Sequence, residues 1–104
     1  MSISGAFEIE REQYGTIVQI LVAGELDLAS APVLYHQLVR EQRDGADAIV
    51  VDLSGVTFID SSGLQALLAA HENDGERLRI ILSPAASRLV DLAGLRDTLP
   101  IIEG

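Results

Sequence analysis

Two nearly continuous apolar runs, at residues 16–23 and 48–53, constrain what this chain can fold into. Both are rich in Val and Ile and short, which predicts β-strands. The first run has almost no polar interruption, a pattern typical of a strand covered on both faces. The segment between the runs is long enough for a helical crossover, so the two strands can pair in parallel.

The rest of the chain continues the alternation. Residues 6–11 alternate apolar and acidic side chains, which predicts an edge strand joined to the first run by a turn at Tyr14-Gly15. Three helices are predicted. The first begins at Ser30, which can act as its N-cap, and ends at Asp44-Gly45; the second covers residues 61–72; the third runs from Ser83-Pro84 to Gly94. Further strands are predicted over residues 78–82 and 100–102, so that the order is typical of an α/β fold in one domain, residues 1–104.

Helical spacing assigns side chains to the core or to solvent. The positions expected to face the core are Leu34, Leu38, Leu64, Leu67, Leu68, Leu89 and Leu92, with His71 partly buried. The positions expected to be solvated are Arg40, Glu41, Arg43, Arg77 and Arg79.

Composition excludes several classes of function. The net charge is −9, with seven Arg, no Lys and no run of basic residues. Because nucleic-acid binding requires clustered basic residues, the composition argues against it. No cysteine is present, and His36 and His71 lie far apart without a ligand-like cluster, so we expect neither a disulfide nor a metal site. No apolar run reaches the length of a membrane span, no secretory signal is visible, and no cofactor motif occurs. We therefore expect a cytoplasmic protein that is not an enzyme, needs no cofactor and contacts neither nucleic acid nor membrane directly.

The segment Asp60-Ser61-Ser62-Gly63 precedes the second predicted helix and follows a central strand. In α/β domains such strand ends are where ligands and partners bind. A helix N-terminus has unpaired amides and a positive dipole end, so it accommodates an added phosphate. Taken alone, however, the four residues are better explained by a helix cap, which contributes about 1 kcal/mol, than by a switch.

Three blocks, in the same order along the chain, resemble the STAS family, named for sulfate transporters and anti-sigma factor antagonists. They are Ile49-Val-Val-Asp-Leu-Ser-Gly-Val-Thr-Phe-Ile-Asp-Ser-Ser-Gly-Leu64, Gly24-Glu25-Leu26-Asp27 in the turn after the second strand, and Ser83-Pro84 with Leu89-Val-Asp-Leu-Ala-Gly-Leu95. Within the family the chain is most similar to the stand-alone bacterial antagonists. The resemblance implies a mixed, mostly parallel sheet of four to five strands, with three to four helices packed mainly on one face.

The resemblance also implies a cycle. The unmodified antagonist binds an anti-sigma factor and frees sigma. The anti-sigma factor then acts as an ATP-dependent serine kinase, phosphorylates the serine after the aspartate, here Ser61, and the complex dissociates. A PP2C-type phosphatase restores the antagonist. Ser62 is the second candidate for the acceptor.

The candidate partner-binding residues are Glu25, Asp27, Asp60, Ser61, Ser62, Gly63 and Gln65. Asp60 could repel a phosphate, cap the helix, or do both, and turn chemistry explains Glu25 and Asp27 nearly as well as partner binding does. Gln65 replaces a glycine that is frequent in close relatives, which bears on the identity of the partner. The alternative function is a non-switching scaffold or accessory subunit of a transport or signalling complex.

Overall fold

The computed structural model describes residues 7–102; Ala6, where the first predicted strand begins, lies outside them. The elements in chain order are β1 (Glu8–Tyr14), β2 (Ile17–Leu26), α1 (Ala31–Arg43), β3 (Ala48–Ile59), α2 (Ser61–Asp74), β4 (Leu78–Ile81) and α3 (Pro84–Leu92). This α/β order matches the predicted one, apart from the last strand.

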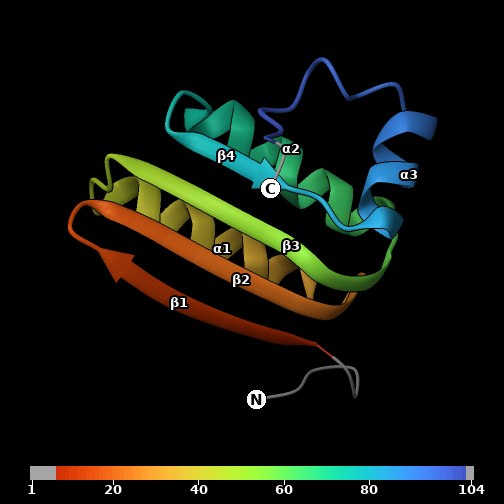
Figure 1. Cartoon of the computed structure of the whole chain (residues 1–104), viewed down its shortest axis with the longest axis horizontal. Helices are drawn as coiled ribbons and strands as arrows, with labels where there is room; N and C mark the ends of the chain where they lie inside the picture. The colour runs from red at the N-terminus through yellow and green to blue at the C-terminus, as the bar shows by residue number, and fades with distance from the viewer. Residues whose placement is uncertain (1–6, 103–104) are drawn as a thin grey trace.

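The strands form one mixed, mostly parallel sheet in the order β1-β2-β3-β4 (Figure 1). β1 is antiparallel to β2, whereas β2–β3 and β3–β4 are parallel. The strand predicted at residues 100–102 is wrong as a full element, because the described chain forms only a single bridge there, between Ile80 and Ile101. Ile80 donates its amide to the Pro100 carbonyl and accepts the amide of Ile102.

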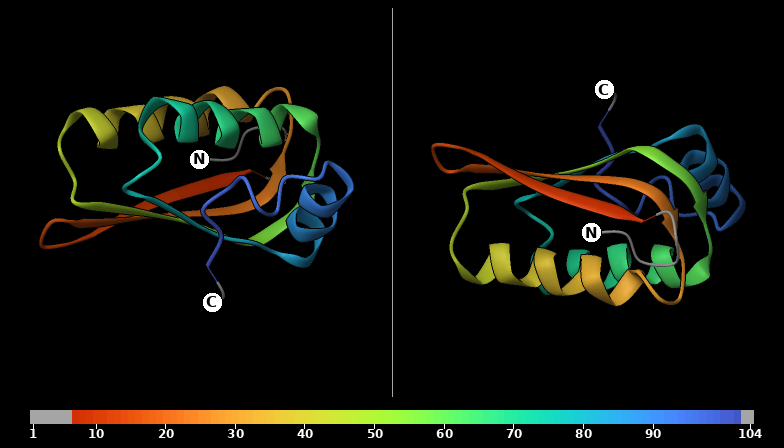
Figure 2. Two further views of the ribbon diagram at one scale, coloured as in Figure 1. Left: turned by 90° about the horizontal axis from the view of Figure 1, so that it is seen from above. Right: turned by 90° about the horizontal axis from the view of Figure 1, so that it is seen from below.

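The helices leave part of the sheet open. Figure 2 shows α1 and α2 covering one face, while α3 lies beside the C-terminal half of β3, beyond the end of β4. In β2 the residues facing α1 and α2, such as Val18 and Ile20, are buried, but Ile17 on the other face is 46% exposed. The prediction that β2 is covered on both faces is therefore wrong.

Apolar side chains, most of them aliphatic, fill the space between the sheet and the two helices. The largest fully buried ones are Phe7, Ile20, Leu26, Leu34, Leu38, Ile49, Leu53, Leu67, Leu78 and Ile80. The predicted inward positions of α1 and α2 are confirmed in this core.

The predicted exposures of Glu41 and Leu92 are wrong. Glu41 is 2% exposed, because its carboxylate accepts hydrogen bonds from Arg11 of β1, at 2.5 and 3.1 Å, and from Gln37. Leu92 was expected in the core and is 79% exposed, because α3 buries Ala86 and Val90 instead.

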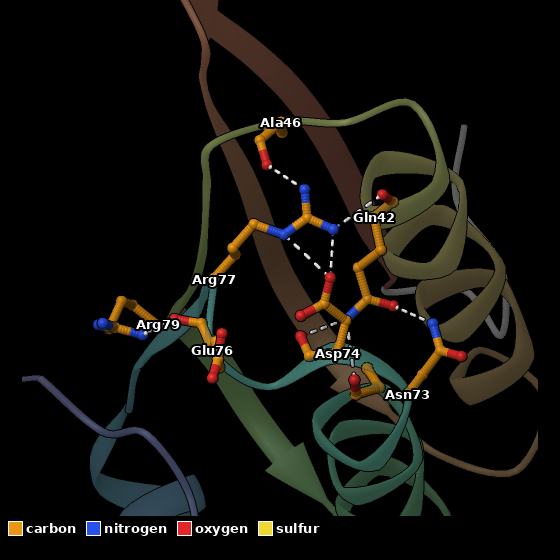
Figure 3. Close-up of polar contacts among 8 residues, drawn as sticks. Gln42, Ala46, Asn73, Asp74, Glu76, Arg77 and Arg79 are labelled. Carbon is orange, nitrogen blue, oxygen red and sulfur yellow. Dashed lines mark hydrogen bonds and ion pairs between the residues drawn. The ribbon is translucent and has the colours of Figure 1, made fainter.

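A polar network that we name the clamp joins the C-terminal ends of α1 and α2 to the start of β4 (Figure 3). The buried Gln42 amide donates to the carbonyls of Ala70 and Asp74, at 2.8 and 3.0 Å, and accepts from the Asn73 amide at 2.7 Å. The bond to Asp74 satisfies a carbonyl of the last turn of α2, which has no partner within the helix.

Arg77 completes the clamp. Its guanidinium pairs with Asp74 and donates to the carbonyls of Ala46 and Gln42, at 2.9 and 3.1 Å. The prediction that Arg77 is simply solvated is therefore wrong, whereas Arg79 is exposed as expected.

Candidate functional site

The carboxyl ends of β2 and β3 lie side by side, which brings together segments far apart in the sequence. Leu26 pairs with Ile59, and the Asp60 amide donates to the Leu26 carbonyl at 3.3 Å. Glu25 and Asp27 therefore lie close to the start of α2, at the edge of a parallel sheet where partners commonly bind.

β3 is longer than predicted. Residues 56–59, expected to lie between strand and helix, belong to β3, so Asp60 alone joins it to α2. Register shifts between β2 and β3, at Leu21/Ala23 and Gly24/Glu25, accompany the extension. Such irregularities bend strands and often occur next to functional sites.

Asp60 is the N-cap of α2. Its Oδ1 accepts hydrogen bonds from the backbone amides of Ser62, at 2.9 Å, and Gly63, at 3.3 Å. Two of the amides that a helix start leaves without a partner are thereby satisfied. The carboxylate is directed into its own helix.

The two candidate acceptor serines differ in exposure. Ser61 is the first residue of α2 and is exposed, whereas Ser62 is half-buried and lines a groove between α1 and α2. Gln65 is exposed one turn further along the helix and lines the same groove.

Gly63 allows close packing between α2 and the end of β2. A Cβ at this position would lie 2.8 Å from Leu26 Cγ and 2.9 Å from both Ile59 Cγ1 and the Leu26 carbonyl oxygen. Because side chain and backbone both approach so closely, only glycine lets α2 begin at this distance from β2.

The turn from β2 into α1 is held by its own polar groups. The Asp27 carboxylate accepts from the amides of Ala29, at 3.0 Å, and Ser30, at 3.1 Å. The Ser30 amide is the principal cause of the lowered pKa of Asp27.

Ser30 precedes α1 but does not cap it as predicted, because its buried side chain makes no cap hydrogen bond. The hydroxyl instead accepts the Asp27 amide and lies 2.9 Å from the Glu25 carbonyl. Glu25 itself is a residue of β2 rather than of a turn.

The polar pattern of the sequence did not reveal the apolar side chains at this edge. Leu28 is 76% exposed in the turn before α1, and Phe58 is 50% exposed near the end of β3. Phe58 shares a cleft with Leu92 and Arg88 of α3. An isolated leucine within a polar turn was the one available signal for Leu28.

Other site types find no support within residues 7–102. No group of three His, Cys, Asp or Glu side chains there could hold a metal ion. None of the described helices has the length and hydrophobicity needed to cross a membrane.

Comparison with known proteins places this chain in a family. The family model described as "Mlab, STAS domain" matches residues 9–103. The anti-sigma-B factor antagonist of Staphylococcus aureus is 33% identical over 100 residues, covering 92% of this chain and 93% of that protein.

Solved structures agree. An anti-sigma factor antagonist from Mycobacterium paratuberculosis superposes with a TM-score of 0.87 at 30% identity, covering all of this chain and 92% of that one. The Bacillus cell fate determinant SpoIIAA in its phosphorylated form shares the fold, with a TM-score of 0.68 at 21% identity over 95% of this chain and 91% of that one. Members of this group are regulators rather than enzymes, and the chain belongs to the STAS-domain family of anti-sigma factor antagonists.

Proposed function

We propose that this chain is a phosphorylation-controlled antagonist. The unmodified form binds an anti-sigma factor that is also a serine kinase, and sigma is released. Phosphorylation of Ser61 switches the binding off, and a PP2C-type phosphatase restores it in the cytoplasm. The observation that carries the proposal is the exposed position of Ser61 in the first turn of α2, next to the N-cap residue Asp60.

Ser61 is favoured over Ser62 as the acceptor. A kinase needs to reach the hydroxyl, and Ser61 is exposed, whereas the Ser62 side chain lies in a groove and its amide is bonded to Asp60. A phosphate on Ser61 would remain at the helix N-terminus, where the dipole favours negative charge. Phosphorylation therefore need not unfold α2.

A phosphate on Ser61 would weaken binding of the anti-sigma factor through charge and desolvation. A phosphate adds about −1.5 to −2 charges. A negative group of the partner about 5 Å away would be repelled by about 1–3 kcal/mol in a partly exposed setting, and Asp60, the neighbouring residue, adds its own charge to that of the phosphate. Apolar side chains nearby, Leu28 and Phe58, supply contacts that would desolvate the phosphate in a complex. Since about 1.4 kcal/mol corresponds to tenfold in affinity, these terms together suffice for release.

Phosphate mapping tests the proposal. The protein is incubated with ATP and each candidate anti-sigma kinase of its own genome, and the phosphate is located by mass spectrometry. We expect modification of Ser61, loss of modification in Ser61→Ala, and normal modification in the matched variant Ser62→Ala. The proposal fails if no kinase modifies Ser61 and Ser61→Asp binds the partner as the wild type does.

A second candidate is a non-switching scaffold or accessory subunit of a transport or signalling complex. Two observations favour this candidate. The description of the matching family model names Mlab rather than an anti-sigma factor antagonist, and Gln65 adds a larger side chain beside Asp60-Ser61-Ser62-Gly63. For this candidate, a stable complex would form with a protein other than an anti-sigma factor, and Ser61→Asp would leave its affinity unchanged.

A further inference from the structure

The groove between α1 and α2 opens at the same edge as the acceptor serine. Leu28, Ala31 and Tyr35 line one side, and Ser62, Gln65 and Ala69 line the other, around a volume of 360 Å³. This groove is separate from the cleft that Phe58 shares with α3.

The chemistry of the groove differs from that of the chain as a whole. The net charge of the chain is −9, yet the described residues that line the groove include no carboxylate and no arginine. The carboxylates of Asp27 and Asp60 do not line the groove, and both accept amides of their own turns. An uncharged, mainly apolar segment of a partner therefore fits this groove better than a basic one.

Small residues leave space for such a segment. Ala31, Ala66 and Ala69 form much of the lining, so a large apolar side chain can approach the two helix backbones closely. Leu28 at the mouth is 76% exposed, and the hydrogen bonds of the Asp27–Ser30 turn hold the backbone that carries it. Because that backbone is already ordered, only the Leu28 side chain loses freedom when a partner covers it.

The groove is continuous with the acceptor segment. Ser62 follows Ser61 directly and lines the groove, so a partner that responds to a modification of Ser61 also reaches the groove mouth.

From the lining of the groove, which includes His36 but no carboxylate or arginine, and from its continuity with Ser61, we infer that the anti-sigma factor inserts an uncharged apolar segment between α1 and α2, with Leu28 as the anchor. This inference rests on the proposed function, because it takes the anti-sigma factor as the occupant. It assigns the main attraction to apolar contact rather than to charge.

Two variants test the groove in different ways. Leu28→Ser removes the anchor from an exposed position, and Ala69→Gln places a longer side chain into the groove. Ile17→Thr is the matched control, since Ile17 is also an exposed aliphatic residue but lies at the hairpin end of β2. Affinity for the anti-sigma factor is measured by calorimetry, and circular dichroism checks that each variant is folded.

We expect Leu28→Ser and Ala69→Gln each to weaken binding at least tenfold, while Ile17→Thr binds as the wild type does. If the wild type binds and releases the partner on Ser61 phosphorylation, but both groove variants keep wild-type affinity, the groove inference is overturned and the proposed function stands. If the unmodified wild type binds no anti-sigma factor, the proposed function itself fails, and the groove inference fails with it.

Discussion

The two ends of the α1–α2 pair use polar residues in opposite ways. At the clamp, Gln42 and Arg77 cross-link α1, α2 and the segments beside them through buried or half-buried hydrogen bonds. At the other end, the carboxylates of Asp27 and Asp60 accept hydrogen bonds from groups of their own turns.

The contrast shows where a partner can bind. The clamp consumes its polar groups in holding the fold together and leaves little for recognition. At the acceptor end local caps satisfy the backbone, so that a serine and apolar side chains such as Leu28 remain exposed. Under the proposed function, Asp27 and Asp60 would support the partner-binding surface, and exposed neighbours such as Leu28 would make the contacts.

The largest effect expected is at the clamp. Gln42→Ala would remove a buried amide and leave the carbonyls of Ala70 and Asp74 without that donor. We expect the free energy of unfolding to fall by about 3 kcal/mol, measured by urea denaturation. Binding of the anti-sigma factor by the folded variant should be unchanged.

The matched control is Gln13→Ala, in which the lost bond, to the Gly15 carbonyl, is exposed. Its effect on stability should be close to zero. A Gln42→Ala variant as stable as Gln13→Ala would show that the clamp does not hold the helices.

Gly63→Ala would affect both stability and binding. The added Cβ would clash with Leu26 and Ile59, which should cost about 2 kcal/mol despite the better helix propensity of alanine. Because α2 must shift to relieve the clash, partner affinity should also fall. Ser62→Ala, one residue away, adds no atoms and serves as the control. A stabilised Gly63→Ala variant would contradict the close approach.

The cap at Asp60 is expected to contribute less. Asp60→Ala should lower the free energy of unfolding by about 1 kcal/mol, because the amides of Ser62 and Gly63 lose their acceptor. Asp60→Ser retains a capping oxygen and should recover most of the loss. Thermal unfolding measures the stability of both variants. Equal losses of stability in Asp60→Ala and Asp60→Ser would exclude a capping role.

Asp27 should give the smallest effect, visible as a pH dependence. Its pKa is lowered in the folded state, chiefly by the Ser30 amide, so the carboxylate stabilises the fold at pH values above its ordinary pKa. That contribution is lost as the pH falls through the folded-state pKa. The stability difference between wild type and Asp27→Asn should therefore shrink on acidification, and a constant difference would contradict the assignment.

Residue patterns predicted most of the fold because each element carries its own signal. Apolar runs marked β2 and β3, and Ser83 caps α3 as its sequence indicated, accepting the Ala86 amide. The errors concern interactions between elements. Glu41 is buried because Arg11 of a distant strand reaches it, and no local pattern records that pairing.

The sequence predicted the polar residues of the candidate site but not its exposed apolar side chains. Asp60 and the two serines stand next to each other in the sequence, and their nearness to Glu25 and Asp27 follows from the parallel pairing of β2 with β3. The exposure of Leu28 and Leu92 depends on which faces the tertiary packing leaves uncovered. Helical periodicity even placed Leu92 in the core.

One measurement tests the central claim most directly: the affinity of the anti-sigma factor for the unmodified protein and for protein carrying a single phosphate, mapped by mass spectrometry. The account predicts that the phosphate is on Ser61 and that affinity falls at least tenfold. Because desolvation contributes, the loss should persist at about 0.5 M salt, where exposed charges are largely screened. Equal affinities of the two forms, or release that depends on a phosphate at another residue, would contradict it.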